Sequence, residues 1–236
     1  MEKIIHRADT RGKFEYGWLK TNYTFSFSQY YDPERVQFGL LRVLNDDIFE
    51  AGRGFSTHSH DNMEIVTIPL QGALAHRDST GHEEIIRAND VQIMSAGTGI
   101  HHSEVNASDS EPVSLLQIWV FPHRNGRQPR YDQKSFNPAE RLNALQYLVT
   151  PDKSDGNLWL NQDAWFSRAE ISEGKSLKYS LHNRKNGVCL FVIDGGVRVG
   201  ENELNKRDGL GIWDASEIEV AAHAAADVLF IEVPMS

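Results

Sequence analysis

Short runs of alternating apolar and polar residues fill most of the chain, and glycine, asparagine or aspartate separates one run from the next. Two examples are VQFGLLRVLNDDIFEAG at residues 36–52 and LLQIWVFPHRNGRQP at residues 115–129. A period of two places every second side chain on the same face of a strand, and the polar breaks are typical of turns. The pattern therefore predicts a chain built mainly of β-strands.

Helical periodicity is convincing only in short stretches, the best of which is NPAERLNALQYL at residues 137–148. Asn137 is a suitable N-terminal cap, and Pro138 suits the first helical turn. We expect this segment to form a short helix that links two halves of the chain.

A weak internal repeat indicates that the two halves are alike. Residues 70–100 and residues 193–220 each contain a glycine turn, a strand, a second turn at Gly81 or Gly200, and then an aspartate followed by an apolar strand. Two such antiparallel units imply a pair of barrels or sandwiches, in which the sheet edges are closed or covered.

Charge and composition narrow the range of partners. The formal charge of −9 opposes nonspecific binding to nucleic acid, which depends on clustered positive charge. No apolar run approaches the roughly 18 residues of a membrane-spanning helix, and the first residues lack the apolar core of a secretory signal. The single cysteine, Cys189, excludes an internal disulfide framework. We expect a cytoplasmic monomer with no nucleic acid or membrane partner.

The stretch THSHDNME, residues 57–64, carries several groups that can bind a metal. On a regular strand His58, His60, Asn62 and Glu64 point to the same side. This pattern alone fits either a polar surface strand or one half of a metal site.

A second stretch, AGTGIHHSEVN at residues 96–106, favours the metal site. His102 and Glu104 are again two residues apart, whereas His101 faces the other way. Two such pairs on antiparallel strands can meet across a small barrel, and three imidazoles with one carboxylate suit a divalent transition metal. Gly97 and Gly99 allow the chain to turn tightly before His102.

Together these stretches resemble the paired signature of the cupin superfamily. The matching positions are Gly52, His58, His60, Glu64, Gly72, Gly99, His102 and Asn106, with one extra residue before Gly72. With the upstream segment FSFSQYYDPERVQFGLLRVLNDD and the run IMSAGTGIHHSE, the chain is similar to pirin, and especially to bacterial pirin-like proteins with quercetinase activity.

This resemblance implies an all-β bicupin of two jelly-roll barrels. We expect an N-terminal metal-binding barrel over residues 1–135 and a C-terminal barrel without metal ligands over residues 136–236. The second half agrees, because His182 and His223 form no H-x-H pair and residues 213–215 read Trp-Asp-Ala. We interpret His182 as an ordinary polar residue and Cys189 as a buried core thiol.

Two glutamates compete for the place of the fourth ligand. Many cupins use the glutamate of the first motif, here Glu64, whereas pirins use the one two residues after the last histidine, here Glu104. The short spacing keeps Glu104 on the face of His102, so we expect the ligands to be His58, His60, His102 and Glu104. Glu64 would then orient a ligand imidazole from outside, and His101 is either a second such residue or an exposed strand residue.

The resemblance implies a dioxygenase that opens the central ring of flavonols such as quercetin and releases carbon monoxide. Its small partners would be the aromatic substrate and dioxygen, and its cofactor one divalent metal per chain. We expect Fe(II), with Zn, Cu, Ni, Mn and Co as alternatives. Glu104 would serve as ligand and base in turn. The same ligands also fit a pirin-type regulatory protein with a redox-sensitive metal, or a bicupin that the metal merely stabilises.

Overall fold

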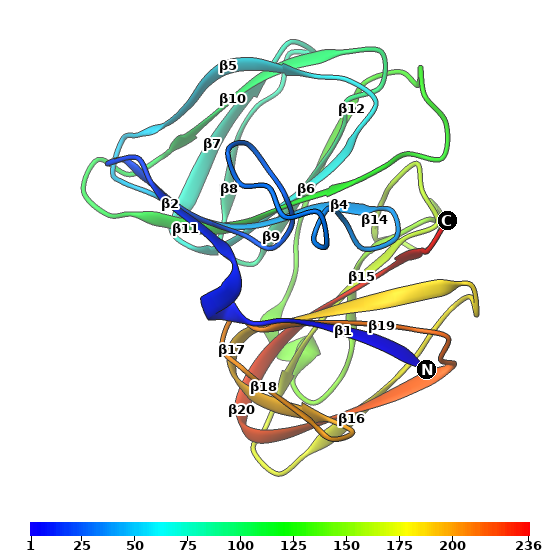
Figure 1. Ribbon diagram of the computed structural model, residues 1–236. Helices are drawn as coiled ribbons and strands as arrows, with labels where there is room; N and C mark the ends of the chain where they lie inside the picture. Colours follow the sequence, from blue (N-terminus) through cyan, green and yellow to red (C-terminus); the bar gives the residue numbers. More distant parts are fainter.

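The computed structural model describes residues 1–236 and is almost entirely β-structure, as the sequence predicts (Figure 1). Its N-terminal unit, drawn from blue to green, contains a seven-stranded and a four-stranded sheet. The larger sheet runs in the order β12 (Arg130–Ser135), β9 (Asp90–Ser95), β6 (Glu64–Gln71), β11 (Val113–Val120), β4 (Leu41–Phe49), β3 (Leu19–Tyr23) and β2 (Gly12–Glu15). The smaller sheet runs β5 (Gly54–His60), β10 (Ile100–Asn106), β7 (Ala73–Asp78) and β8 (Glu83–Arg87).

The C-terminal unit is one nine-stranded sheet. Its main path is β1 (Glu2–His6), β19 (Gly209–Trp213), β17 (Asn186–Val199), β20 (Glu217–Pro234), β15 (Trp165–Ile171), β13 (Gln146–Thr150) and β14 (Leu158–Trp159). Two further strands, β16 (Ser176–Ser180) and β18 (Asn202–Asn205), pair with β20 and β17. The sheets form open paths of antiparallel strands apart from the parallel pair β13–β14, and none closes into a barrel.

The start of the chain belongs in space to the second unit. Strand β1 pairs along its whole length with β19, and Figure 1 shows it in blue within the lower unit. A 3-10 helix, η1 (Ala8–Thr10), then leads to β2 in the upper unit. The division of the chain after residue 135 stays a prediction, and the first strand crosses it.

The expected linking helix is much shorter than its sequence pattern. Only η2 (Pro138–Arg141) forms, as a 3-10 turn, and the side chain of Asn137 accepts a hydrogen bond from the Ala139 amide at 3.1 Å. Asn143 then adopts a positive φ of 53°. Leu148, which the helical pattern included, instead lies buried in strand β13. Burial against the neighbouring sheet therefore overrides the weak helical preference of this segment.

The largest hydrophobic core joins the two units. It contains 24 buried residues, among them Val66 and Ile68 of β6 and Phe191 and Ile231 of the C-terminal sheet. Ile65, which directly precedes Val66 and therefore points to the other face of β6, packs in a separate cluster with Ile100. The seven-stranded sheet is thus buried on both faces, with the shared core on one side and the four-stranded sheet on the other.

Two residues of the second half lie as expected. Cys189 is a buried free thiol, and burial raises its pKa to about 12. The His182 ring stacks on Trp165 with 4.4 Å between ring centroids, and its Nδ1 lies 2.9 Å from an oxygen of Glu232. No helix of the structure is long and apolar enough to cross a membrane.

Because the core is shared, we expect the two units to unfold together. Phe191→Ala removes a fully buried ring from this core and should lower the free energy of unfolding by about 3–5 kcal/mol. Urea denaturation followed by tryptophan fluorescence and circular dichroism measures this change. Tyr31→Ala, at an aromatic residue with 75% of its surface exposed, is the control and should change it by less than about 0.5 kcal/mol. Two separate transitions, only one of which moves in Phe191→Ala, would contradict a shared core.

Candidate metal centre

Strand pairing brings the predicted histidines together. In the antiparallel pair β10–β5, His102 lies opposite His58 and Ile100 lies opposite His60. The register shifts between His102 and Glu104, so that Glu104 faces Phe55. On its other side β10 pairs with β7. The three histidines therefore lie on two neighbouring strands of the four-stranded sheet, His58 and His60 on β5 and His102 on β10.

The three imidazoles converge on one point. Ring centroids are 4.4 Å apart for His58 and His102, 4.9 Å for His58 and His60, and 4.9 Å for His60 and His102. The candidate ligand atoms of these residues lie within 4.8 Å of one another. Both ring nitrogens of His102 are buried and have no hydrogen-bond partner in the protein. The arrangement fits a transition metal, which would satisfy such a nitrogen.

Burial keeps two of the three rings neutral, which is the form that binds a metal. Burial, and after it the neighbouring imidazoles His102 and His58, lower the pKa of His60 to about 3. Burial, followed by His58 and His76, lowers the pKa of His102 to about 3. The Nδ1 atom of His58 lies 2.9 Å from the backbone oxygen of Ser56, which holds the ring and leaves Nε2 as its free nitrogen.

Glu104 lies beside the histidines in a second, overlapping group. Its carboxylate is within 4.8 Å of candidate ligand atoms of His76 and His102. The side-chain amide of Gln117 donates to its two oxygens at 3.1 and 3.0 Å, and burial raises its pKa above the ordinary value. The structure thus places Glu104 next to His102 but groups it with His76, and its role as a ligand stays a prediction.

His76 is the neighbour that the sequence interpretation missed. Its ring is fully buried 5.3 Å from that of His102, and its Nε2 lies 3.1 Å from an oxygen of Asp78. A signal was present, because His76 and Asp78 are two residues apart and lie on the same face of β7. This spacing did not indicate that His76 lies opposite Glu104 in the pairing of β7 with β10.

Glu64 and His101, the two residues expected to act from outside, lie in other surroundings. The Glu64 carboxylate accepts hydrogen bonds from Ser95 Oγ at 2.7 Å, from the Asn161 amide at 3.2 Å and from Asn161 Nδ2 at 3.1 Å. It makes no hydrogen bond to an imidazole, and burial raises its pKa. His101 is exposed, and its backbone N–H donates to Ser79 Oγ at 3.1 Å. Glu64 therefore tethers Asn161, which lies between β14 and β15 of the second unit.

A cavity of about 160 Å³ opens onto the histidines and Glu104. Aromatic side chains form much of its wall, including Tyr23, Phe27 and Trp119, and the Trp119 ring lies 4.9 Å from that of His60.

The cavity is also lined by Asp47, whose carboxylate accepts a hydrogen bond from the Thr21 hydroxyl. Burial, with smaller contributions from Asp46 and Glu104, raises the pKa of Asp47 to about 7 despite that bond. These wall residues come from strands far apart in sequence, and the sequence alone did not identify them.

Family models match both parts of the chain. The model described as Pirin matches residues 5–120, and the one described as Quercetinase C-terminal cupin domain matches residues 147–233. The chain is 41% identical over 231 residues to a protein of Escherichia coli named quercetin 2,3-dioxygenase, with 98% of each chain covered. It is 36% identical over 225 residues to a pirin-like protein of Caulobacter vibrioides, covering 95% of this chain and 96% of that one.

Solved structures agree with these matches. The bacterial pirin YhhW of Escherichia coli, crystallised in complex with nickel(II), has a TM-score of 0.94 and 39% identity, and each chain is covered completely. A second crystal structure of YhhW has a TM-score of 0.95 and covers 100% of this chain and 99% of that one.

The first prediction for this centre concerns its histidines. His102→Ala removes a central imidazole and should weaken Ni²⁺ binding by more than about 100-fold, since loss of an outer partner alone costs about 10- to 100-fold. His101→Ala is the matched control, because its exposed ring lies on the opposite face, and should bind like the wild type. Isothermal titration of the metal-free proteins measures both affinities. Unchanged Ni²⁺ affinity in His102→Ala would show that the metal binds elsewhere.

The second prediction concerns stoichiometry. The described chain has no group of three histidine, cysteine or carboxylate side chains with converging ligand atoms in the C-terminal unit. Elemental analysis of the metal-loaded protein should therefore give close to one ion per chain. A second tightly bound ion that persists in a His58→Ala, His60→Ala double variant would contradict a metal-free C-terminal unit.

Proposed function

The chain belongs to the pirin family, and from this premise we propose that it is a metal-dependent dioxygenase that opens the central ring of a flavonol such as quercetin. In this reaction both atoms of dioxygen enter the organic product and carbon monoxide leaves. The observation that carries the proposal is the aromatic-walled cavity lined by His58, His60 and Glu104, with the buried His102 imidazole beside these histidines.

We assign the metal to His58, His60, His102 and Glu104. Three neutral imidazoles and one carboxylate suit a divalent transition metal, and Fe(II) is our first choice, with Ni among the alternatives. A bound ion would supply Lewis acidity toward the substrate hydroxyl and redox chemistry toward dioxygen. The nickel complex of the similar Escherichia coli pirin supports a divalent ion at this type of centre.

Glu104 is the proposed base for the 3-hydroxyl of the flavonol. Its carboxylate lines the cavity, where it can accept the proton of a substrate hydroxyl, and a bound ion would ease this transfer by lowering the pKa of that hydroxyl. Gln117 donates to both of its oxygens and orients it, while Thr67 donates to the Gln117 oxygen at 2.8 Å and fixes that amide in turn. The base is thus held by two further side chains, on β11 and β6.

The cavity walls determine how a flavonol can enter. At about 160 Å³ the cavity is smaller than the roughly 300 Å³ or more of pockets that enclose a drug-sized ligand. We infer that the hydroxylated edge of the central ring enters, while the rest of the molecule lies at the mouth. Phe27 and Trp119 pack edge to face against each other with 5.2 Å between their ring centroids, and both line the cavity, where they offer aromatic surface to a planar substrate.

The experiment is a comparison of turnover in two glutamate variants. The loss of visible absorbance of quercetin under air is followed with protein loaded with Fe²⁺, Ni²⁺, Cu²⁺ or Mn²⁺, and with the metal-free form. Glu104→Gln keeps the size of the side chain but removes most of its basicity, so turnover at saturating metal should fall by a factor on the order of 10² or more. Glu64→Gln, whose side chain still accepts a bond from Asn161, should remain close to the wild type.

Two outcomes would change the assignment. Loss of activity in Glu64→Gln with none in Glu104→Gln would exchange the roles of the two glutamates. Wild-type protein that binds each metal yet turns over no quercetin would leave the pirin-type regulatory role as the better account.

A further inference from the structure

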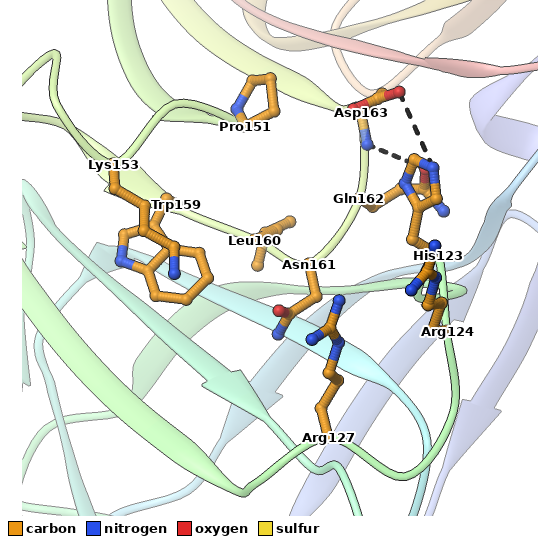
Figure 2. Close-up of a pocket in the computed structure, with 10 residues that line it drawn as sticks. All are labelled: His123, Arg124, Arg127, Pro151, Lys153, Trp159, Leu160, Asn161, Gln162 and Asp163. Atoms are coloured by element: carbon orange, nitrogen blue, oxygen red, sulfur yellow. Dashed lines mark hydrogen bonds and ion pairs between the residues drawn. The ribbon is translucent and has the colours of Figure 1, made fainter.

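A second concave region lies between the two units and shares no lining residue with the metal cavity. It is a cleft of about 410 Å³, formed by the loop that follows β11 and by the segment from Pro151 to Asp163 (Figure 2). Only two of its ten lining residues are hydrophobic, so its lining suits a polar ligand and differs from the aromatic cavity at the histidines.

The cleft gathers positive charge in an acidic protein. Arg124, Arg127 and Lys153 line it, and none of the three forms an ion pair within the chain, although the formal net charge is −9. The one acidic lining residue is Asp163, whose carboxylate lies 4.0 Å from Nε2 of His123. Like charges that converge without a partner repel one another, and an anion between them relieves that repulsion.

Figure 2 shows how these cations lie. Arg127 reaches from its loop toward Asn161, Arg124 and His123 stand beside it, and Lys153 lies over Trp159 on the other side of the cleft. Lys153 Nζ is 4.0 Å from the Trp159 ring centroid, which places this ammonium against an aromatic wall. The charges therefore approach the cleft from both of the segments that form it.

Contacts between the two walls hold the cleft in shape. The His123 amide donates to the Asn161 carbonyl at 2.7 Å, and Gln162 Nε2 donates to the Phe121 carbonyl at 2.8 Å. Arg130 lies 3.6 Å from the centroid of the Trp159 ring and also donates to the Trp159 carbonyl. These contacts fix the two walls of the cleft before a ligand binds, so that binding costs little conformational entropy.

The loop that carries Arg124 and Arg127 is also held by hydrogen bonds to residues near the metal centre. The Gly126 amide donates to Asn62 Oδ1 at 2.7 Å, and the Thr98 amide donates to the Arg127 carbonyl at 2.8 Å. Gly97 has a φ of 52°, and a Cβ there would lie 2.1 Å from the Arg127 oxygen. This close approach requires glycine and sets the position of Arg127.

We propose that this cleft is a binding site for a small oxyanion, specifically the phosphate group of a polar metabolite. A guanidinium presents parallel N–H donors that match two oxygens of a phosphate, and a lysine ammonium adds a point charge. The volume exceeds that of one phosphate and leaves room for the remainder of a small molecule. The cleft and the metal cavity have no lining residue in common, so an anion bound here would not occupy the proposed dioxygenase site.

The test is isothermal titration of inorganic phosphate, and then of pyrophosphate, into the metal-loaded protein at pH 7.5 with ionic strength held constant by sodium chloride. The wild type should bind with saturation at one site per chain. Arg127→Gln and Lys153→Gln should each weaken binding by about tenfold or more, because each removes a charge-assisted donor. Both residues are exposed, so their replacement should leave the melting temperature unchanged.

Arg184→Gln is the matched control. Arg184 is exposed, lies just before β17 and does not line the cleft, so this variant should bind phosphate like the wild type. Absence of saturable binding of either anion to the wild type would overturn the proposal. Equal affinities in the wild type and in the Arg127→Gln, Lys153→Gln double variant would also overturn it, since phosphate would then bind elsewhere, for example at the metal.

Discussion

The candidate metal centre depends on the antiparallel pairing of β10 with β5. This pairing sets His102 opposite His58 and brings His60 within 4.9 Å of both rings. A slip of one residue would turn each histidine to the other face of its strand and disperse the cluster. The register shift after His102 places Glu104 opposite Phe55 of β5, and on the other side of β10 Glu104 lies opposite His76 of β7.

That pairing is supported by the burial of the seven-stranded sheet behind it. Alternate residues of β6 face opposite sides of the sheet, since Val66 and Ile68 join the core shared with the C-terminal unit while Thr67 holds Gln117 beside Glu104. The C-terminal sheet therefore supports the candidate centre without contributing a side chain to its converging groups. It covers the face of β6 and β11 that would otherwise be exposed, and thereby fixes the strands from which Thr67 and Gln117 project.

The sequence predicted those features that depend on local pattern. Alternation identified the strands, and the spacing of two residues in His58–His60 and in His102–Glu104 identified the side chains that share a face. The proposed helix over residues 137–148 was mostly wrong, because burial of the β13 residues outweighs a weak local preference. The sequence did not predict the role of His76 or the hydrogen bond between Glu64 and Asn161. Both depend on which distant strands and loops become neighbours, and the hydrophobic period of a strand contains no information about this.

The same contacts connect the metal centre with the cleft between the units. Asn62, two residues after His60, holds the Gly126 amide, and Thr98, four residues before His102, holds the Arg127 carbonyl. Glu64 and Asn161 add a third link from the start of β6 to the opposite wall of the cleft. Each link starts at or close to a strand that carries a residue of the candidate metal centre or its neighbourhood. The loops that fix the imidazoles therefore also fix the cations, so one rigid framework sets the geometry of an apolar cavity and of a charged cleft at the same time.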